Sequence, residues 1–192
     1  MSPLPRALVR AATVLACTAG LVAAPSLASA AELVHTDPAG DVRTGGTESE
    51  TGRPAPGERR TDIRNVRISH SVDAVTVRIR TRGALPRKKV FVTVTLRTPA
   101  GAYEASYMKL FGTTYQGVAQ DMEDIDCPGF VADLGGKVTT LTIPTSCIGS
   151  PEWIRAGVGV GQLRGERWTA DDGLRRGLRG QDLRLSQRIA RG

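Results

Sequence analysis

Apolar and polar residues alternate along most of the chain from residue 63 onward, with the period of two that is typical of β-strands. The runs 63–72 and 75–80 flank the short connection Asp73-Ala74, so they predict a hairpin. The run 90–98 (VFVTVTLRT) is rich in β-branched residues, which favour strands. This part of the chain is therefore expected to form antiparallel sheet.

Further strands are expected on the same basis, and a Gly-Gly pair at 135–136 marks another hairpin. They cover residues 32–36, 103–110, 116–122, 130–134, 138–143 and 153–162. No segment within 31–173 shows a convincing helical period of 3.6 residues. Eight or nine short strands joined by Gly- and Pro-containing turns predict an all-β fold, an antiparallel, jelly-roll-like β-sandwich.

Two segments interrupt this pattern. Residues 37–61 are rich in Gly, Glu, Pro, Thr and Arg and are expected to form a long flexible loop. Residues 174–192 carry six arginines against one acid, and their glycines oppose a helix, so a basic, disordered tail is expected. Such a tail either contacts anionic cell-wall polymers or a membrane surface, or has no partner.

The N-terminus has the three parts of an export signal. A basic stretch is followed by an apolar run and by the small residues SLASA, which predicts a signal peptide over 1–30 with cleavage after Ala30. A rival interpretation is lipoprotein processing at Cys17, although the residues after Cys17 stay apolar. No later segment approaches the ~18 apolar residues of a membrane span. We therefore expect a secreted protein without a transmembrane segment.

Removal of the signal leaves 162 residues, which suits one domain over 31–173 followed by the tail. The formal charge of the whole chain is +7, but the signal and the tail account for all of it, and 31–173 is neutral. This distribution argues against a basic nucleic-acid-binding domain, and a monomer is expected.

Two cysteines remain after processing, Cys127 and Cys147. An even count in an oxidising compartment predicts a disulfide between them, and both lie in turn-like sequence.

Catalytic motifs are scarce. The two histidines, His35 and His70, are not accompanied by a G-x-S-x-G motif, and zinc, P-loop and dinucleotide signatures are missing from the sequence. Two carboxylates on separate loops could still form a glycosidase pair, because sequence spacing does not reveal such a pair. The expectation is a protein that is not an enzyme, and a small secreted hydrolase is the third-ranked alternative.

Clusters of acidic residues indicate a candidate calcium site, since Ca²⁺ prefers several carboxylate and carbonyl oxygens. One cluster combines Asp37 and Asp41 with Asp62, and Asp171 and Asp172 would join it if the first and last strands were neighbours. The other cluster is the segment 121–126, which holds four acids. Turn formation by Asp, or a solvated acidic loop, explains either cluster without a metal.

Aromatic residues could form a binding platform for a glycan. Tyr103 and Tyr107 share a strand face, ~13 Å apart by strand rise, and Trp168 could complete the platform. The alternative, that these side chains fill the core of the sandwich, is favoured by the usual burial of tyrosine.

Several short motifs together suggest a family. They are D-P-A-G-D-V (37–42), D-I-x-x-V-x-I-x-H (62–70), V-T-V-R-I-R-T-R (75–82) and C-I-G-S-P-E-W-I-R-A-G-V (147–158). With the export signal, this pattern resembles small secreted proteins of high-GC Gram-positive bacteria whose opening is similar to carbohydrate-binding-like and DOMON-like sandwich domains. The resemblance implies a jelly-roll fold, a loop-bound Ca²⁺ near Asp37, Asp41 and Asp62, and no catalytic activity. A haem-ligand pair placed as in haem-binding DOMON domains is missing from the sequence.

The sequence thus predicts a secreted, non-catalytic binding module for an extracellular glycan or cell-wall polymer. The alternative is a protein-interaction or inhibitor domain that uses the 37–61 loop as its contact.

Overall fold

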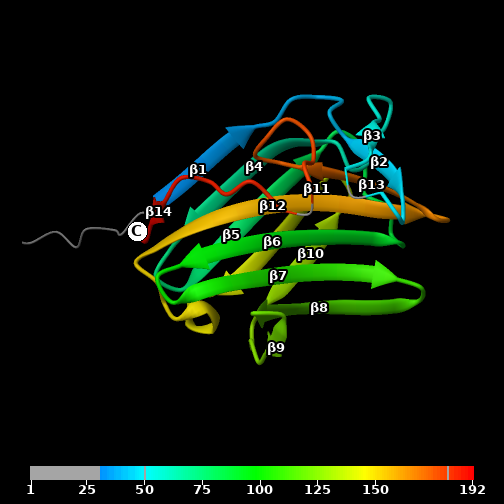
Figure 1. Ribbon diagram of the computed structural model, residues 1–192. Coiled ribbons are helices and arrows are strands. Elements are labelled where there is room, and N and C mark those ends of the chain that lie inside the picture. The colour runs from blue at the N-terminus through cyan, green and yellow to red at the C-terminus, as the bar shows by residue number, and fades with distance from the viewer. Residues whose placement is uncertain (1–30, 50, 181) are drawn as a thin grey trace, which may run out of the picture.

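The computed structural model describes residues 31–49, 51–180 and 182–192, which form two antiparallel sheets packed face to face (Figure 1). The predicted signal peptide 1–30 and Cys17 lie outside the described residues. The smaller sheet has the order β1 (Ala31–Thr36), β4 (Ile63–His70), β5 (Ala74–Thr81), β11 (Val138–Pro144) and β10 (Val131–Gly135).

The larger sheet begins with the short strands β3 (Arg53–Pro54) and β2 (Arg43–Gly46) and continues through the strands that form its body. These are, in order, β13 (Arg167–Asp172), β12 (Trp153–Arg164), β6 (Val90–Thr98), β7 (Gly101–Leu110), β8 (Thr113–Gln120) and β9 (Glu123–Ile125). A final strand, β14 (Ile189–Ala190), pairs with β12. The predicted all-β, two-sheet sandwich is confirmed.

The core lies between the sheets and is built from the apolar positions of the alternating pattern. In β6, for example, Val92, Val94 and Leu96 are fully buried, while Thr93 and Thr95 between them are half-buried on the outer face. The alternation is visible in the sequence because most strands bury one face, although β12 is buried on both. Burial of side chains of this size stabilises the fold by about 1.5–3 kcal/mol each.

The 37–61 segment differs from the expected featureless loop. It contains β2 and β3, and β2 pairs with β13 from Arg43↔Ala170 to Gly46↔Arg167. Trp168 explains much of this order, because its Nε1–H donates to the carbonyl oxygen of Ser49 at 3.1 Å. A Cβ at Gly52 would overlap the indole, so the glycine allows the loop backbone to close over the ring.

The described residues of the tail, for which disorder was predicted, follow a defined path over the larger sheet. Residues 182–188 run over β12, where a Cβ at Gly157 or Gly159 would lie 2.9 Å from Leu183. Ser186 continues the contact through hydrogen bonds with Ala156, and β14 follows (Figure 1). The glycine stripe of β12 thus forms a shallow channel for the tail, a long-range contact that local composition does not reveal.

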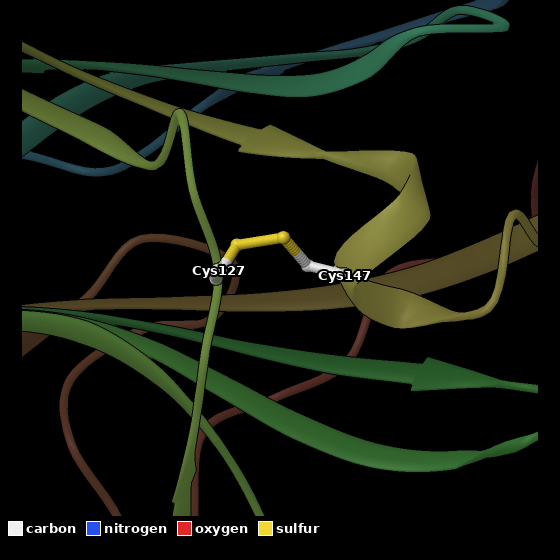
Figure 2. Close-up of a disulfide and its surroundings, with 2 residues drawn as sticks. All are labelled: Cys127 and Cys147. Atoms are coloured by element: carbon white, nitrogen blue, oxygen red, sulfur yellow. A yellow bond between two sulfur atoms is a disulfide. The ribbon is translucent and has the colours of Figure 1, made fainter.

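The predicted disulfide between Cys127 and Cys147 is confirmed. Their Cα atoms lie 5.4 Å apart, and Figure 2 shows the bond joining the connection after β9 to the 3₁₀ turn η1 (Thr145–Ile148). The bond closes a loop with a sequence separation of 20 residues, which corresponds to about 3 kcal/mol of stabilisation in the chain-entropy model.

η1 is short, and within the described part of the chain no helix has the length and apolar character needed to cross a bilayer.

Candidate metal site and the hollow beside it

Five aspartates from three segments lie at one end of the sandwich. Asp37 follows β1, Asp41 precedes β2, Asp62 precedes β4, and Asp171 with Asp172 ends β13. Asp171 and Asp172 were expected to join the other acids if the first and last strands were neighbours, and β1 and β13 belong to different sheets. Packing of the sheets brings the acids together, and the Ile63 N–H bridges the sheets by donating to Asp171 Oδ2 at 2.9 Å.

Three of these residues can converge on one ion. Asp37, Asp41 and Asp171 each offer a carboxylate oxygen, and these oxygens lie within 4.8 Å of one another. Asp37 and Asp171 are fully buried. Three oxygen ligands at this spacing suit a hard cation such as Ca²⁺, whose ligands lie at 2.3–2.6 Å.

Several oxygens in the cluster have no hydrogen-bond partner among the described residues. They are both carboxylate oxygens of Asp37, Oδ1 of Asp41 and Oδ1 of Asp62. The second oxygens of Asp41 and Asp62 are occupied, since they accept the N–H groups of Gly177 and Gly40. Buried carboxylates without partners are costly, so the free oxygens require either a proton or a cation.

The electrostatics of the cluster lead to the same requirement. Burial, followed by the neighbouring carboxylates beginning with Asp171, raises the pKa of Asp37 to about 9. Burial also raises the pKa of Asp171 to about 7, opposed by the hydrogen bond from Ile63. In the absence of a counter-ion these groups hold protons in a range where carboxyls are ordinarily ionised.

Asp62 and Asp172 have roles different from those of the convergent three. Asp62 Oδ2 forms an ion pair with Arg82 at 3.0 Å, so only its Oδ1 is free to face an ion. Both carboxylate oxygens of Asp172 contact the tail. They accept hydrogen bonds from the N–H groups of Leu174 and Arg184, and the carboxylate forms an ion pair with Arg175 at 2.8 Å. Asp172 was predicted as a weaker metal ligand, but it follows Asp171 in the strand, and its carboxylate instead anchors the tail.

The second acidic cluster, 121–126, does not form a comparable site. Its four acidic side chains are exposed, and Asp124 accepts a hydrogen bond from the Tyr115 hydroxyl at 2.6 Å.

The aromatic platform is not assembled as expected. Tyr103 is buried in the core at 6% exposure, and Tyr107 lies on the same strand face and is half-buried. Trp168 is on the outer face of the larger sheet, where it stands beside Leu163. The three side chains therefore do not share a binding face, because the Tyr103 side of β7 packs against the other sheet.

A hollow of about 580 Å³ lies instead on the outer face of the larger sheet. Its floor includes Phe91 and Thr93 of β6, and Trp168 with the 47–49 loop forms one wall. The tail contributes Leu178 and Leu183. Sequence reasoning missed this hollow because one of its walls is the tail.

Two carboxylates, Glu48 and Glu104, also line the hollow. Glu104 Oε1 accepts a hydrogen bond from the Ser106 hydroxyl at 2.8 Å, which fixes the position of its carboxylate.

The metal site and the hollow share structural elements. Asp171 lines the hollow and belongs to the convergent three. Asp41 holds the tail through Gly177, which lies next to Leu178. The position of the tail wall therefore depends on the carboxylates at the candidate metal site.

Among the described residues, neither histidine forms a hydrogen bond with a serine hydroxyl, as a hydrolytic site would require. His35 Nε2 lies 4.0 Å from Asp37 Oδ1, and His70 is fully buried with Nδ1 at 3.2 Å from the Ile189 carbonyl oxygen.

Comparison with protein-family models, with curated proteins and with solved structures finds no match to this chain. The functional argument therefore depends on the geometry alone.

Proposed function

We propose that this protein is a secreted, monomeric, non-catalytic binding module that Ca²⁺ stabilises and that binds a glycan or cell-envelope polymer in the hollow on the larger sheet. The observation that carries the calcium part is the fully buried Asp37, whose two oxygens lack hydrogen-bond partners among the described residues and one of which converges with oxygens of Asp41 and Asp171. An ion there would link the connection between β1 and β2 to the end of β13.

The choice of Ca²⁺ follows from the donor set. The three converging donors are all carboxylate oxygens, which suit hard cations, whereas structural zinc sites are built from cysteine and histidine ligands. Mg²⁺ demands a smaller octahedral shell and keeps several waters, which a buried site does not readily hold.

The test of the calcium proposal is thermal unfolding of the oxidised, signal-free protein in CaCl₂ and in EGTA. At a calcium concentration a hundredfold above Kd, a ligand specific for the folded state adds about 2.7 kcal/mol. That gain corresponds to a rise in Tm of roughly 5–10 °C for a domain of this size.

The variant Asp37→Asn should lose most of this rise, because the amide removes the charge and one oxygen donor. Its Tm in EGTA should stay close to that of the unaltered protein, since Asn resembles the protonated carboxyl that burial favours. The matched control is Asp121→Asn, an exposed position with φ 50° that Asn tolerates. No calcium response in the unaltered protein, or an equal loss in both variants, would contradict the proposal.

The glycan part is supported by the lining of the hollow. Phe91 and Trp168 offer apolar ring surface, while the Thr93 and Thr95 hydroxyls and the two carboxylates can hydrogen-bond to sugar hydroxyls. A glycan array, followed by pull-down with insoluble cell-wall preparations, should identify a ligand whose binding Trp168→Ala reduces at least tenfold. Phe111→Ala is the control, because Phe111 is 82% exposed and does not line the hollow.

Hydrolysis of the same ligand is the alternative outcome, because two glutamates, Glu48 and Glu104, line the hollow and glycosidases use a pair of carboxylates. If the bound glycan is cleaved and Glu104→Gln abolishes cleavage while retaining binding, the protein is a hydrolase and the non-catalytic proposal fails. Unchanged ligand after prolonged incubation supports the proposal.

The 37–61 segment supports the second candidate, a protein-interaction or inhibitor domain. Its tip is held by Trp168 and by the Gly52 N–H, which donates to the Ser49 hydroxyl at 3.1 Å, and a pre-ordered loop suits a protein contact. A blank glycan array together with capture of one defined extracellular protein, abolished by substitutions at Thr47 and Glu48, would favour it.

A further inference from the structure

Basic side chains gather on the smaller sheet, on the side of the sandwich away from the hollow. One depression of about 420 Å³ is lined by Arg64, Arg78, Arg80, Arg82 and Lys137. A second depression of about 720 Å³ shares Arg82 and Lys137 and adds four more cations. These are Arg59, Arg60, Arg87 and Lys88. We call these nine residues the basic face.

The basic face is not neutralised by its surroundings. Among the described residues, no acidic side chain lines either depression. One residue of the basic face, Arg82, forms an ion pair, with Asp62. Acids stand at its margin: Glu32 pairs with Arg67 at 2.9 Å, and Asp133 is two strands away from Arg78.

The arrangement of the strands concentrates this charge. Arg78 and Arg80 stand two apart on β5, on the same outer face and about 6.6 Å from each other by strand rise. Arg67 of β4 lies directly opposite Arg78, but Arg67 is paired with Glu32. Arg78 and Arg80 are both exposed, so their guanidinium groups are accessible to an anionic ligand.

The depressions on the larger sheet have the opposite character. Within the described chain, the hollow and a neighbouring depression are lined by Glu48, Glu104, Asp121, Asp124 and Asp171, and by no Lys or Arg. The larger sheet carries exposed arginines as well, among them Arg97 and Arg167, but these lie outside both depressions.

We propose that the basic face binds a chain of repeated phosphates. Guanidinium groups match phosphate oxygens with paired hydrogen bonds, and the strand spacing presents them in a row that an extended polyanion can follow. No aromatic side chain lines either depression in the described structure, so stacking on bases or sugar rings would contribute nothing and charge would dominate. The phosphates belong to an extended polymer rather than to lipid headgroups, and its contacts with Arg78 and Arg80 involve neither the candidate metal site nor the hollow.

The experiment measures binding of fluorescently labelled linear inorganic polyphosphate to the oxidised, signal-free protein at several NaCl concentrations in EGTA. The double variant Arg78→Gln/Arg80→Gln should weaken binding by at least tenfold at low salt. The slope of log K against log salt should also fall by roughly 1.4, since each contact with a flexible polyanion contributes about 0.7.

The matched control is Arg97→Gln/Arg167→Gln, which removes two exposed strand arginines from the larger sheet and changes the net charge equally. Its affinity should stay within about twofold of the unaltered protein. Equal loss in both double variants would overturn the proposal, because net charge alone would then explain binding.

Two further arms identify the source and the chemistry. Binding to phosphatidylglycerol vesicles but not to polyphosphate overturns the polymer proposal, and the reverse result supports it. Binding to neither, or equal affinity for poly-L-glutamate, overturns the assignment to phosphate. A variant whose Tm in EGTA matches that of the unaltered protein is folded, so failure here is distinguishable from failure of the proposed function.

Discussion

Asp171 and Asp172 are consecutive residues with opposite tasks. The alternation of a strand directs their side chains to opposite faces of β13, so that Asp171 points to the candidate metal site and Asp172 to the tail. Both are fully buried, and burial raises the pKa of each. Their difference lies in what each carboxylate contacts.

This difference predicts two distinguishable variants. Asp171→Asn should weaken calcium binding at least tenfold, because one of three converging carboxylates is lost. Asp172→Asn should keep most of the calcium-dependent rise in Tm but expose the tail to protease, since it removes the Arg175 ion pair and one acceptor. Isothermal titration with CaCl₂ and limited trypsin digestion separate the two effects. Identical behaviour of the variants would show that the two carboxylates act as one unit.

At the scale of elements, the contact between the tail and β12 sets the shape of the hollow. Leu183 packs over Gly157 and Gly159, and it also lines the hollow with Leu178. The glycines of β12 therefore contribute by lacking side chains, since any Cβ there would occupy the channel of the tail.

Gly159→Val should consequently lift the tail from the sheet. We expect faster hydrogen exchange and trypsin cleavage after Arg179 or Arg184, together with loss of glycan binding, while the two sheets remain folded. The control is Gly57→Val, because a Cβ at Gly57 meets no atom within 4 Å. A protected tail in the Gly159 variant would contradict the channel interpretation.

At the scale of the whole molecule, the buried carboxylates link stability to pH. The raised pKa values of Asp37, about 9, and of Asp171, about 7, mean that the folded protein binds protons that the unfolded chain releases near pH 4. In EGTA, the stability contributed by these protons is fully present below about pH 4 and is lost as the pH rises toward 9.

Thermal unfolding from pH 5 to pH 9 should therefore show a falling Tm in EGTA and a smaller fall in CaCl₂, because the ion takes the place of the protons. His35 Nε2 lies 4.0 Å from Asp37 Oδ1, and His35→Gln isolates its contribution. A Tm in EGTA that rises across this range would contradict the assignment of protonated carboxyls.

Much of the sandwich could be predicted from the sequence, because a strand with one buried and one exposed face has alternating apolar and polar residues. The disulfide was predictable from cysteine count, and the acidic residues at segment ends indicated Asp37, Asp41 and Asp62. The ordered tail and the hollow were not predictable, since they depend on glycines of β12 and on Trp168 meeting distant segments. The basic face was missed because a neutral sum hides which side of the molecule each charge occupies.

The two ends of the described chain meet at a single residue. Ala31 pairs with His70 at the start of β1, and the Gly192 N–H donates to the His70 carbonyl oxygen at 3.1 Å (Figure 1). A few glycine and serine residues would be enough to join residue 192 to residue 31, and the exposed turn at Phe111-Gly112 offers a place for new ends. The domain is accordingly suited to circular permutation, and to insertion as one unit into a surface loop of another protein.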